Sequence, residues 1–477
     1  MSATAPAPST APADRVPLPQ KIVYGLGTFH DMWGHWLYHT LAYPVFNIGL
    51  GVSPALIGTA LIFNRLWDAF SDPFFGWWSD NARTRFGRRR PFILFGGVLA
   101  GLMLPVLFLA PRGLLENQYF WFMILSSGVY IPVMSCFNMA FQSLGAEMTP
   151  DYHERTIVMS YKGVIQKVAE VAMFCAAQFT TLAIFNDAAG KPDILRGAQT
   201  YCVLLGGIMV VAAIVMFLVL RERYYENVSA RKQQKVSLPV AMREALSSGP
   251  FRLFLGWRLA FGVGFSMLGT LGYYMTIYYV CSGNVVVGNQ WNTWMGVAGM
   301  TFSLLGVPTF AFIAGRFGKR QSLMSVFGTA IAVFLASWVL YDPARPWLQI
   351  FASGLIAFAQ SAFWMLDGSI LADVIDHDEL SSGKRREGIF QAFGSWTIKV
   401  GLAIGGGAAG YVLTYTGFDQ ALGGNQSGQT LTLIRLWFAA IPIAGAILAI
   451  FILLRYPLTK EVMADLRAKL EAKRGTV

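Results

Sequence analysis

The sequence predicts an all-α membrane protein whose twelve transmembrane helices form two pseudo-symmetric six-helix bundles. Three observations predict this fold class. Hydrophobic residues make up 55% of the 477 residues and charged residues only 13%, whereas an ordinary soluble domain has roughly 25% charged residues. Apolar runs of about 20 residues, long enough for a helix to cross a bilayer, recur along the whole chain. Finally, short basic loops repeat at matching places in the two halves.

The apolar runs give the order of the predicted spans. Their centres lie near Leu37, Phe63, Leu102, Ile131, Ala169, Val210, Leu268, Ser303, Ile331, Gly354, Leu402 and Gly445. An even number of spans puts both chain ends on one side of the membrane, and the loops on that side hold most of the lysines and arginines. The opposite loops offer only Arg112, Lys191, Arg196 and Arg345. By the positive-inside rule, we predict a multi-pass plasma (inner) membrane protein with both termini in the cytoplasm.

The chain is expected to divide into five parts. They are a disordered cytoplasmic tail at 1–20, a first six-helix bundle at 21–221, a cytoplasmic linker at 222–249, a second six-helix bundle at 250–456 and a cytoplasmic tail at 457–477. The basic loops and their contact with anionic lipid explain the net charge of +11, so membrane lipid rather than nucleic acid is the expected partner. The four cysteines lie in or beside apolar spans at unrelated spacings, which argues against a disulfide framework or a metal cluster.

An internal repeat supports the division into two bundles. The sequence RFGRR begins at Arg85 and RFGKR begins at Arg316, and each follows the second span of its half. A second pair of similar stretches begins at Ala146 and at Ala372, each between the fourth and fifth spans of its half. Such a repeat is typical of transporters that are built from two bundles around a central site.

The second span places ionisable side chains inside the membrane. Asp68 and Asp72 are four residues apart, so they share one helix face, with Arg65 about one turn earlier. An unpaired charge at the bilayer centre costs at least about 2.5 to 3.5 kcal/mol, and two carboxylates at one spot repel each other unless a cation or a proton joins them. We therefore predict a site for a coupling ion, with Arg65 tuning its charge and Ser71 and Ser135 adding neutral oxygens. The alternative is a structural Asp–Arg network that holds no ion.

Two other spans carry polar side chains at helical spacing. Asp31 and His35 lie on one stripe of the first span, and Lys162 and Glu170 lie on one stripe of the fifth. A histidine in a cavity could bind a substrate hydroxyl or anion, or carry the coupling proton. The alternatives are a self-satisfied His–Asp pair and a structural Lys162–Glu170 pair. The second half adds three membrane charges, Arg258, Asp367 and Lys399.

The cytoplasmic loops offer a gate. Asp80 with Arg88 and Arg89, and Asp373 with Arg385, are candidates for charge pairs that hold one bundle against the other. An exposed pair is worth only about 0 to 1 kcal/mol, but several pairs can bias an equilibrium between two states that differ by a few kcal/mol. The alternative is that these charges only set the topology.

The run from Arg65 to Pro91, RLWDAFSDPFFGWWSDNARTRFGRRRP, resembles the second helix and following loop of the glycoside-pentoside-hexuronide cation symporters. These are the melibiose-carrier group of the major facilitator superfamily. The loops at 147–156 and 383–388 are also similar to those of the group, and the resemblance spans nearly the whole chain. It implies the major facilitator fold, and it implies that Asp68 and Asp72 bind sodium, lithium or a proton.

The resemblance also shows departures from the melibiose carriers. Their sugar-holding aspartate of helix four is Asn138 here, the tryptophan one turn later is Gln142, and the arginine of helix five is Lys162. Ser71 stands between the carboxylates, where sodium users have an asparagine, and Lys399 matches a lysine of helix eleven that lies near both sites. The predicted ion site therefore carries over better than the sugar site.

These observations predict a sodium- or proton-coupled secondary active symporter for a glycoside or related sugar, working by alternating access. The predicted substrate-binding residues are Asp31, His35, Asn138, Gln142, Lys162 and Lys399. The alternative is a sodium-dependent lysophospholipid symporter, because animal lysolipid carriers resemble the same group and the sugar-holding residues differ here. A non-transporting membrane sensor is a remote alternative. The sequence has no HExxH, GxSxG or P-loop pattern, so we expect no enzyme. We expect a monomer with no cofactor and no metal beyond a coupling sodium.

Overall fold

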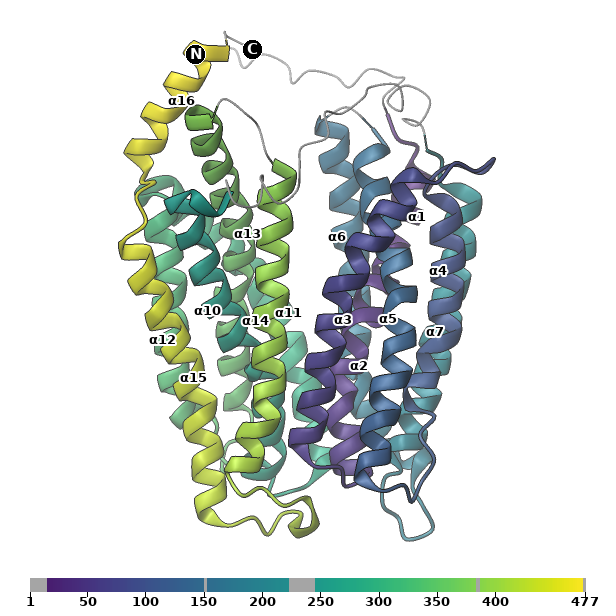
Figure 1. Ribbon diagram of the computed structural model, residues 1–477. Helices are drawn as coiled ribbons and strands as arrows, with labels where there is room; N and C mark the ends of the chain where they lie inside the picture. Colours follow the sequence, from purple (N-terminus) through teal and green to yellow (C-terminus); the bar gives the residue numbers. More distant parts are fainter. Residues whose placement is uncertain (1–14, 150–151, 223–244, 383–386, 475–477) are drawn as a thin grey trace. The chain divides into compact units, whose positions relative to one another are not determined.

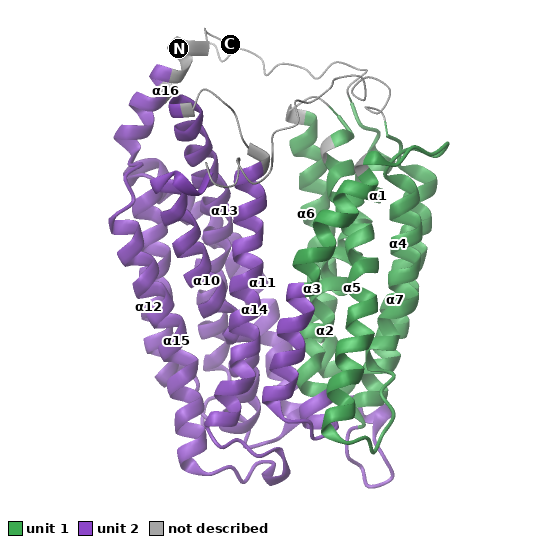
Figure 2. Ribbon diagram, in the orientation of Figure 1, with its two compact units in different colours: residues 1–45, 67–180, 193–233 green, residues 46–66, 181–192, 234–477 purple. Residues whose placement is uncertain are grey.

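The structure, a computed structural model, describes residues 15–149, 152–222, 245–382 and 387–474. Regular structure in these ranges is helical, apart from one isolated bridge between Asn186 and Pro192. The chain divides into two compact units (Figure 2). Unit 1 comprises residues 1–45, 67–180 and 193–233, and unit 2 comprises residues 46–66, 181–192 and 234–477. The predicted linker at 222–249 lies largely outside the described residues, so the predicted domain limits stay a prediction.

Unit 1 contains most helices of the first half of the chain (Figure 1). In order they are α1 (Leu18–Phe29), η2 (His30–Gly34), α2 (His35–Ala42), the later part of α3 (Pro54–Asn81), α4 (Arg90–Met103), η4 (Leu104–Phe108), α5 (Glu116–Glu147), α6 (Tyr152–Thr180) and α7 (Ile194–Val219). The boundary between the units falls inside α3, after Leu66.

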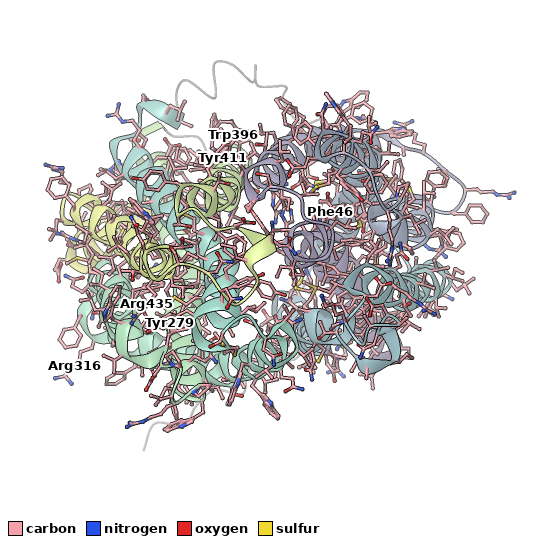
Figure 3. All side chains as sticks on the ribbon, turned by 90° about the horizontal axis from the view of Figure 1, so that it is seen from below. Phe46, Tyr279, Arg316, Trp396, Tyr411 and Arg435 are labelled. Atoms are coloured by element: carbon pink, nitrogen blue, oxygen red, sulfur yellow. The ribbon has the colours of Figure 1, made fainter. Side chains whose placement is uncertain are left out.

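Unit 2 contains the first part of α3 and the helices of the second half. The latter are α10 (Gly249–Tyr274), η6 (Met275–Val280), α11 (Val285–Phe317), α12 (Lys319–Leu340), α13 (Leu348–Ser382), α14 (Glu387–Tyr415), η7 (Gln420–Leu422), α15 (Gly428–Leu454) and α16 (Lys460–Arg474). The short η5 (Ala183–Phe185) and most of η3 (Tyr43–Gly49) also belong to it. Arg435 of α15 lies between the rings of Tyr279 and Trp338, 4.2 Å from each ring centroid, and Figure 3 labels Arg435 and Tyr279.

The described helices account for the twelve predicted spans. Nine of them are long and apolar enough to cross a membrane. The other three spans are the continuous helical stretch at 18–49, α3 and α6. These are the stretches that contain Asp31, Asp68 with Asp72, and Lys162, so the same polar residues that predict a site also lower the apolar character of their helices. The prediction of an all-α membrane protein is confirmed.

π-Helical segments occur in the first and seventh spans. In the first span, α1 passes into η2 and α2 passes into η3, and in the seventh span α10 passes into η6. Single π-helical turns within α-helices are often found at functional sites. The matching positions of η3 and η6 agree with the predicted internal repeat. Within unit 2, a hydrogen bond joins the C-terminal parts of the first and seventh spans. The Tyr274 hydroxyl donates it to Asn47 Oδ1 of η3 over 2.5 Å.

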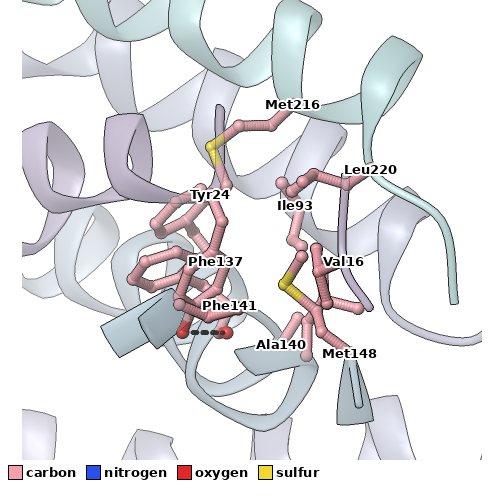
Figure 4. Packing of buried hydrophobic residues seen from close by; sticks show 11 residues of the cluster. Val16, Tyr24, Ile93, Phe137, Ala140, Phe141, Met148, Met216 and Leu220 are labelled. Carbon is pink, nitrogen blue, oxygen red and sulfur yellow. Dashed lines mark hydrogen bonds between the residues drawn. The ribbon is translucent and has the colours of Figure 1, made fainter. Parts of the chain in front are cut away.

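The core of unit 1 brings α1 and α5 together (Figure 4). The Tyr24 ring stacks on Phe141, with ring centroids 4.7 Å apart, and Phe141 stacks on Phe137 at 5.5 Å. The Tyr24 hydroxyl also donates to the carbonyl oxygen of Phe141 over 3.5 Å (Figure 4). Glycines make room for these rings, since a Cβ on Gly27 would lie 2.2 Å from Phe141 and a Cβ on Gly145 would lie 1.9 Å from Tyr24.

Within unit 2, the first part of α3 packs closely against α14. A Cβ on Gly58 would lie 2.3 Å from the carbonyl oxygen of Gly407, and a Cβ on Gly407 would lie 2.1 Å from Ile62 Cγ1. Beside this crossing, the hydroxyl oxygens of Thr59 and Tyr411 are 2.7 Å apart, and Figure 3 labels Tyr411. Small residues of this kind allow two membrane helices to approach at backbone distance.

We expect Gly407→Ala to destabilise the protein, because the new methyl group would force α3 away from α14. Overpacking of this kind costs about 1 to 3 kcal/mol of stability. This cost exceeds the stability that a helix gains when alanine replaces glycine. The matched control is Gly406→Ala, since a Cβ there would meet only Ser266 Oγ at 3.9 Å. Thermal unfolding of the purified protein in detergent measures both. Equal melting temperatures for the two variants would contradict the prediction.

Candidate functional site

The candidate cation site lies on the part of α3 that belongs to unit 1. The Asp68 side chain is only 4% exposed, and its Oδ1 lies 3.7 Å from Nε2 of His35. Ser71 Oγ lies 2.7 Å from Ser135 Oγ of α5 and also donates to the Asp68 carbonyl oxygen over 3.3 Å. Asp72, one turn after Asp68, is half-buried. The structure thus brings four of the predicted oxygen-bearing side chains to the same stretch of α3 and α5.

Arg65 is buried one turn before Asp68. Arg65 belongs to unit 2 and Asp68 to unit 1, because the boundary between the units falls between Leu66 and Trp67. Its predicted role in tuning the charge of the site stays a prediction.

A proline fixes α3 against α5 beside this site. Pro132 of α5 has no N–H, so the carbonyl group of Gly128, one turn earlier, lacks its helical partner. The indole Nε1 of Trp67 on α3 donates to this carbonyl oxygen over 2.9 Å. An unpaired carbonyl group inside a membrane costs several kcal/mol, so this bond both satisfies α5 and sets the position of α3 one residue before Asp68.

Four predicted substrate-binding residues form a continuous polar chain in unit 1. Lys162 Nζ of α6 lies 3.9 Å from Asp31 Oδ2 and donates to Gln142 Oε1 over 3.2 Å. The Gln142 amide in turn donates to Asn138 Oδ1 over 3.4 Å. The Lys162 ammonium also lies 5.0 Å from the ring centroid of Phe141. Gln142 is exposed and Lys162 is half-buried, so the chain presents both donors and acceptors to a ligand.

Two further polar side chains, Glu170 of α6 and Trp33 of the first span, form contacts that the sequence did not predict. Glu170 accepts hydrogen bonds from Gln166 over 3.2 Å and from Lys167 over 2.8 Å, so the Lys162–Glu170 pair is replaced by a Lys167–Glu170 pair. The indole of Trp33 is buried and donates to the Ala169 carbonyl oxygen over 2.9 Å, which makes it a link between the first span and α6.

In unit 2, two of the three membrane charges form a buried pair. Arg258 Nη2 of α10 lies 3.2 Å from Asp367 Oδ2 of α13, and the side chains are 11% and 4% exposed. Among the described residues, Asp367 Oδ1 and Arg258 Nε have no hydrogen-bond partner. Gly394 of α14 makes room for the guanidinium group, because a Cβ there would lie 2.4 Å from Arg258 Nη1. Lys399 lies five residues later on α14 and is half-buried, and its substrate role stays a prediction.

Glu147 at the end of α5 binds both predicted gate arginines. Glu147 Oε1 lies 2.6 Å from Arg88 Nη2 and 3.1 Å from Arg89 Nη2. Arg89 also donates to Ser79 Oγ over 2.6 Å. The side chain of Asp80, the predicted partner, lies outside the described residues. Sequence reasoning did not identify Glu147 as the partner of these arginines, because a spacing within one helix does not identify a partner on another.

The predicted gate of the second half is described only in part. Asp373 of α13 is buried and pairs with Lys319 of α12, whose Nζ lies 2.6 Å from Asp373 Oδ2. Arg385, the predicted partner of Asp373, lies outside the described residues.

Glu222, which sequence reasoning also missed, binds the start of α4. Its carboxylate accepts three backbone N–H bonds, from Arg88 over 2.7 Å, Arg89 over 2.6 Å and Arg90 over 2.8 Å. Anionic groups are stabilised at helix N-termini by such unpaired N–H groups and by the helix dipole. Gly87 has φ of +105°, and a Cβ there would lie 2.6 Å from Glu222 Oε1. The only sequence signal was an acidic residue directly after the sixth span.

Sequence comparisons with known proteins agree on one family, and a solved structure agrees on the fold. The family model described as MFS/sugar transport protein matches residues 23–460. The isoprimeverose transporter of Lactiplantibacillus pentosus is 26% identical over 97% of this chain and 95% of its own length. The putative glycoside/cation symporter YagG of Escherichia coli is 26% identical over 89% of this chain and 88% of its own length. The crystal structure of a bacterial homologue of the human lysosomal transporter Spinster superposes with a TM-score of 0.64 at 14% identity, covering 95% of this chain and 97% of that one.

We expect Asp367→Asn to destabilise the protein by about 3 to 5 kcal/mol, because the substitution leaves the Arg258 guanidinium group buried without a counter-charge. The charge-neutral double variant Arg258→Gln/Asp367→Asn should recover most of this loss. Thermal unfolding in detergent measures both variants against the unmodified protein. A single variant as stable as the unmodified protein would contradict the assignment of a coupled pair.

We expect Glu222→Gln to destabilise the protein by about 1.5 to 3 kcal/mol, because charge-assisted hydrogen bonds to three backbone N–H groups become neutral ones. Glu116→Gln is the matched control, since Glu116 is an exposed acid in the first turn of α5 and its loss should cost less than about 1 kcal/mol. Melting temperatures of the two variants in the same detergent provide the comparison. A larger loss in the control would contradict the role given to Glu222.

Proposed function

The chain belongs to the MFS/sugar transport protein family, and on that premise we propose that it is a cation-coupled symporter that carries a glycoside or related sugar by alternating access. Family membership makes it a multi-pass membrane transporter rather than an enzyme. The proposed substrate class follows that of its relatives, which include an isoprimeverose transporter and a putative glycoside/cation symporter.

One observation carries the proposal of cation coupling. Asp68 and Asp72 share a face of a membrane helix, and the hydroxyl groups of Ser71 and Ser135 lie beside them. Carboxylate and hydroxyl oxygens are ligands that a hard cation prefers, and ionisable residues inside a membrane usually mark an ion pathway. Sodium would be held by these oxygens, and a proton would be held by one of the carboxylates. The ion is cargo in this account, because it crosses with the substrate.

The polar chain of Asp31, Lys162, Gln142 and Asn138 supports a hydroxylated substrate. Each sugar hydroxyl can donate one hydrogen bond and accept two, and this chain offers an ammonium, two amides and a carboxylate within one region of unit 1. We propose that the sugar binds along this chain, with His35 beside it.

The first span provides a route for coupling. It holds Asp31 near Lys162 in the polar chain, and four residues later it holds His35 near Asp68 in the cation site. We propose that neutralising Asp68 and Asp72 changes the position of this span at η2 and so favours sugar binding. The coupling is a shared binding free energy, so the sugar must tighten ion binding by the same factor.

The remaining parts of the proposal concern placement in the cell. We propose a plasma (inner) membrane location with both termini cytoplasmic, because the loops on that side hold most of the lysines and arginines. We propose that the carrier works as a monomer.

We also propose that the contact between Gly58, near the start of α3, and Gly407, in the later part of α14, opens in one half of the transport cycle.

Uptake into proteoliposomes tests the function. Imposed sodium or pH gradients should drive accumulation of at least one member of a panel of glycosides. Accumulation of lysophospholipids and not of glycosides would favour the lysolipid carrier instead, and the gradient that drives uptake identifies the ion.

In the same assay, we expect Asp68→Asn and Asp72→Asn each to abolish uphill accumulation, because one carboxylate of the cation site is lost. The variants should still equilibrate substrate or bind it weakly, and their melting temperatures should stay near that of the unmodified protein. Asp465→Asn, on the exposed face of α16, is the control that should accumulate substrate normally. Undiminished uphill uptake in both site variants would reject the assignment.

A further inference from the structure

An apolar crevice of about 320 Å³ lies between α3, α4 and α5 of unit 1. Its walls include Phe75 and Trp78 of α3, Phe92 and Phe95 of α4, and Val133 and Cys136 of α5. The Trp78 ring meets Phe92 edge-on, with centroids 5.4 Å apart, and lies 5.7 Å from Phe75. Phe95 is 68% exposed and Trp78 is 48% exposed, so the crevice opens to the outside of the unit.

Close packing beneath the crevice keeps its floor in place. Gly96 of α4 lies directly against α5, because a Cβ there would be 2.7 Å from the backbone nitrogen of Phe137. Pro132 of α5, which also lines the crevice, belongs to the turn that Trp67 fixes through its bond to Gly128. The crevice is therefore a preformed feature of the helix packing.

The walls determine what can fill the space. Apart from the Trp78 indole and the Cys136 thiol, the side chains around it are hydrocarbon, so water would find few hydrogen-bond partners there. If the space were empty, the side chains that line it would lose favourable dispersion contacts. Because the three helices span the membrane, the neighbouring material is lipid hydrocarbon. An acyl chain is thus the occupant that satisfies both conditions.

The loop at the mouth adds charge. Trp78 lies in the last turn of α3 and Pro91 in the first turn of α4, so the crevice ends at the connecting loop 82–89. Arg83 and Arg85 on this loop are exposed, and within the described residues neither has an acidic partner. Arg88 and Arg89, by contrast, are bound by Glu147. Basic groups at the membrane surface favour anionic lipid head groups.

We propose that this crevice is a binding site for an anionic phospholipid, with one acyl chain between α3, α4 and α5 and the phosphate at Arg83 and Arg85. The site is separate from the proposed transport function and can be tested without any transported substrate. It also braces the helices that carry Ser71 and Ser135, since Cys136 of the crevice is the neighbour of Ser135 in the chain.

Thermal stabilisation of the delipidated full chain in detergent tests the proposal. Dioleoyl-phosphatidylglycerol should raise the melting temperature more than dioleoyl-phosphatidylcholine does, because a ligand that binds only the folded state stabilises it. Val133→Trp should fill the crevice and abolish the response to phosphatidylglycerol, whereas Val203→Trp, on the exposed surface of α7, should retain it. Glycerol phosphate without acyl chains should have no effect.

The charge requirement has its own control. Arg83→Gln/Arg85→Gln should reduce the preference for phosphatidylglycerol to the level of phosphatidylcholine. Arg196→Gln/Arg345→Gln removes the same charge from two other exposed positions, in the first turn of α7 and in the loop between α12 and α13, and should leave the preference intact. Equal responses to the two lipids in the unmodified protein, or a preference that the control pair also removes, would overturn the head-group assignment.

A measurement without a bulky substitution covers the case in which Val133→Trp fails to fold. Phosphatidylglycerol with brominated acyl chains should quench tryptophan fluorescence, and Trp78→Phe should remove part of that quenching at low lipid ratios. Quenching that is unchanged in Trp78→Phe would overturn the proposed place of the acyl chain.

Discussion

The central constraint on this molecule is that ionisable side chains inside a membrane must be compensated. Water cannot solvate them there, so every charge needs an opposite charge, a hydrogen-bond partner or a bound ion. The structure meets this requirement with short local arrangements: Lys162 with Asp31, Arg258 with Asp367, and His35 beside Asp68. In the candidate cation site, the Asp68 and Asp72 carboxylates lie one helical turn apart on α3, beside the hydroxyl groups of Ser71 and Ser135. A bound cation would add to their compensation.

The membrane fold could be predicted from the sequence, for a physical reason. Hydropathy and helical spacing are local properties, so they identify spans and show that Asp68 and Asp72 share a face. Ser71 and Ser135 were predicted to add oxygens to the same ion site, and their hydroxyl oxygens lie 2.7 Å apart. The partners of the predicted gate arginines were missed. Glu147 and Glu222 bind these arginines through contacts between distant segments, and nothing in local spacing points to them.

The two halves preserve the same loop geometry but use different partners. Gly87 and Gly318 both have a positive φ, +105° and +96°, at the start of the third and ninth spans. In the first half, the Glu222 carboxylate lies beside Gly87 and caps α4. In the second half, Lys460 of α16 approaches Gly318, and its ammonium donates to the Gly315 carbonyl oxygen at the end of α11 over 2.7 Å. A glycine with positive φ before the third and ninth spans is thus common to the two halves, whereas the groups that contact it differ.

The three polar spans also bear on how the protein is made. The helical stretch at 18–49, α3 and α6 fall outside the helices apolar enough to cross a membrane by composition, so each would partition poorly from the translocon into lipid as a single helix. The strongly apolar α4, α5 and α7 that follow them along the chain can enter unaided. Biogenesis therefore has to retain the weak helices beside the translocon until their apolar neighbours emerge. The charges in the interior therefore make the insertion of these three helices depend on their apolar neighbours.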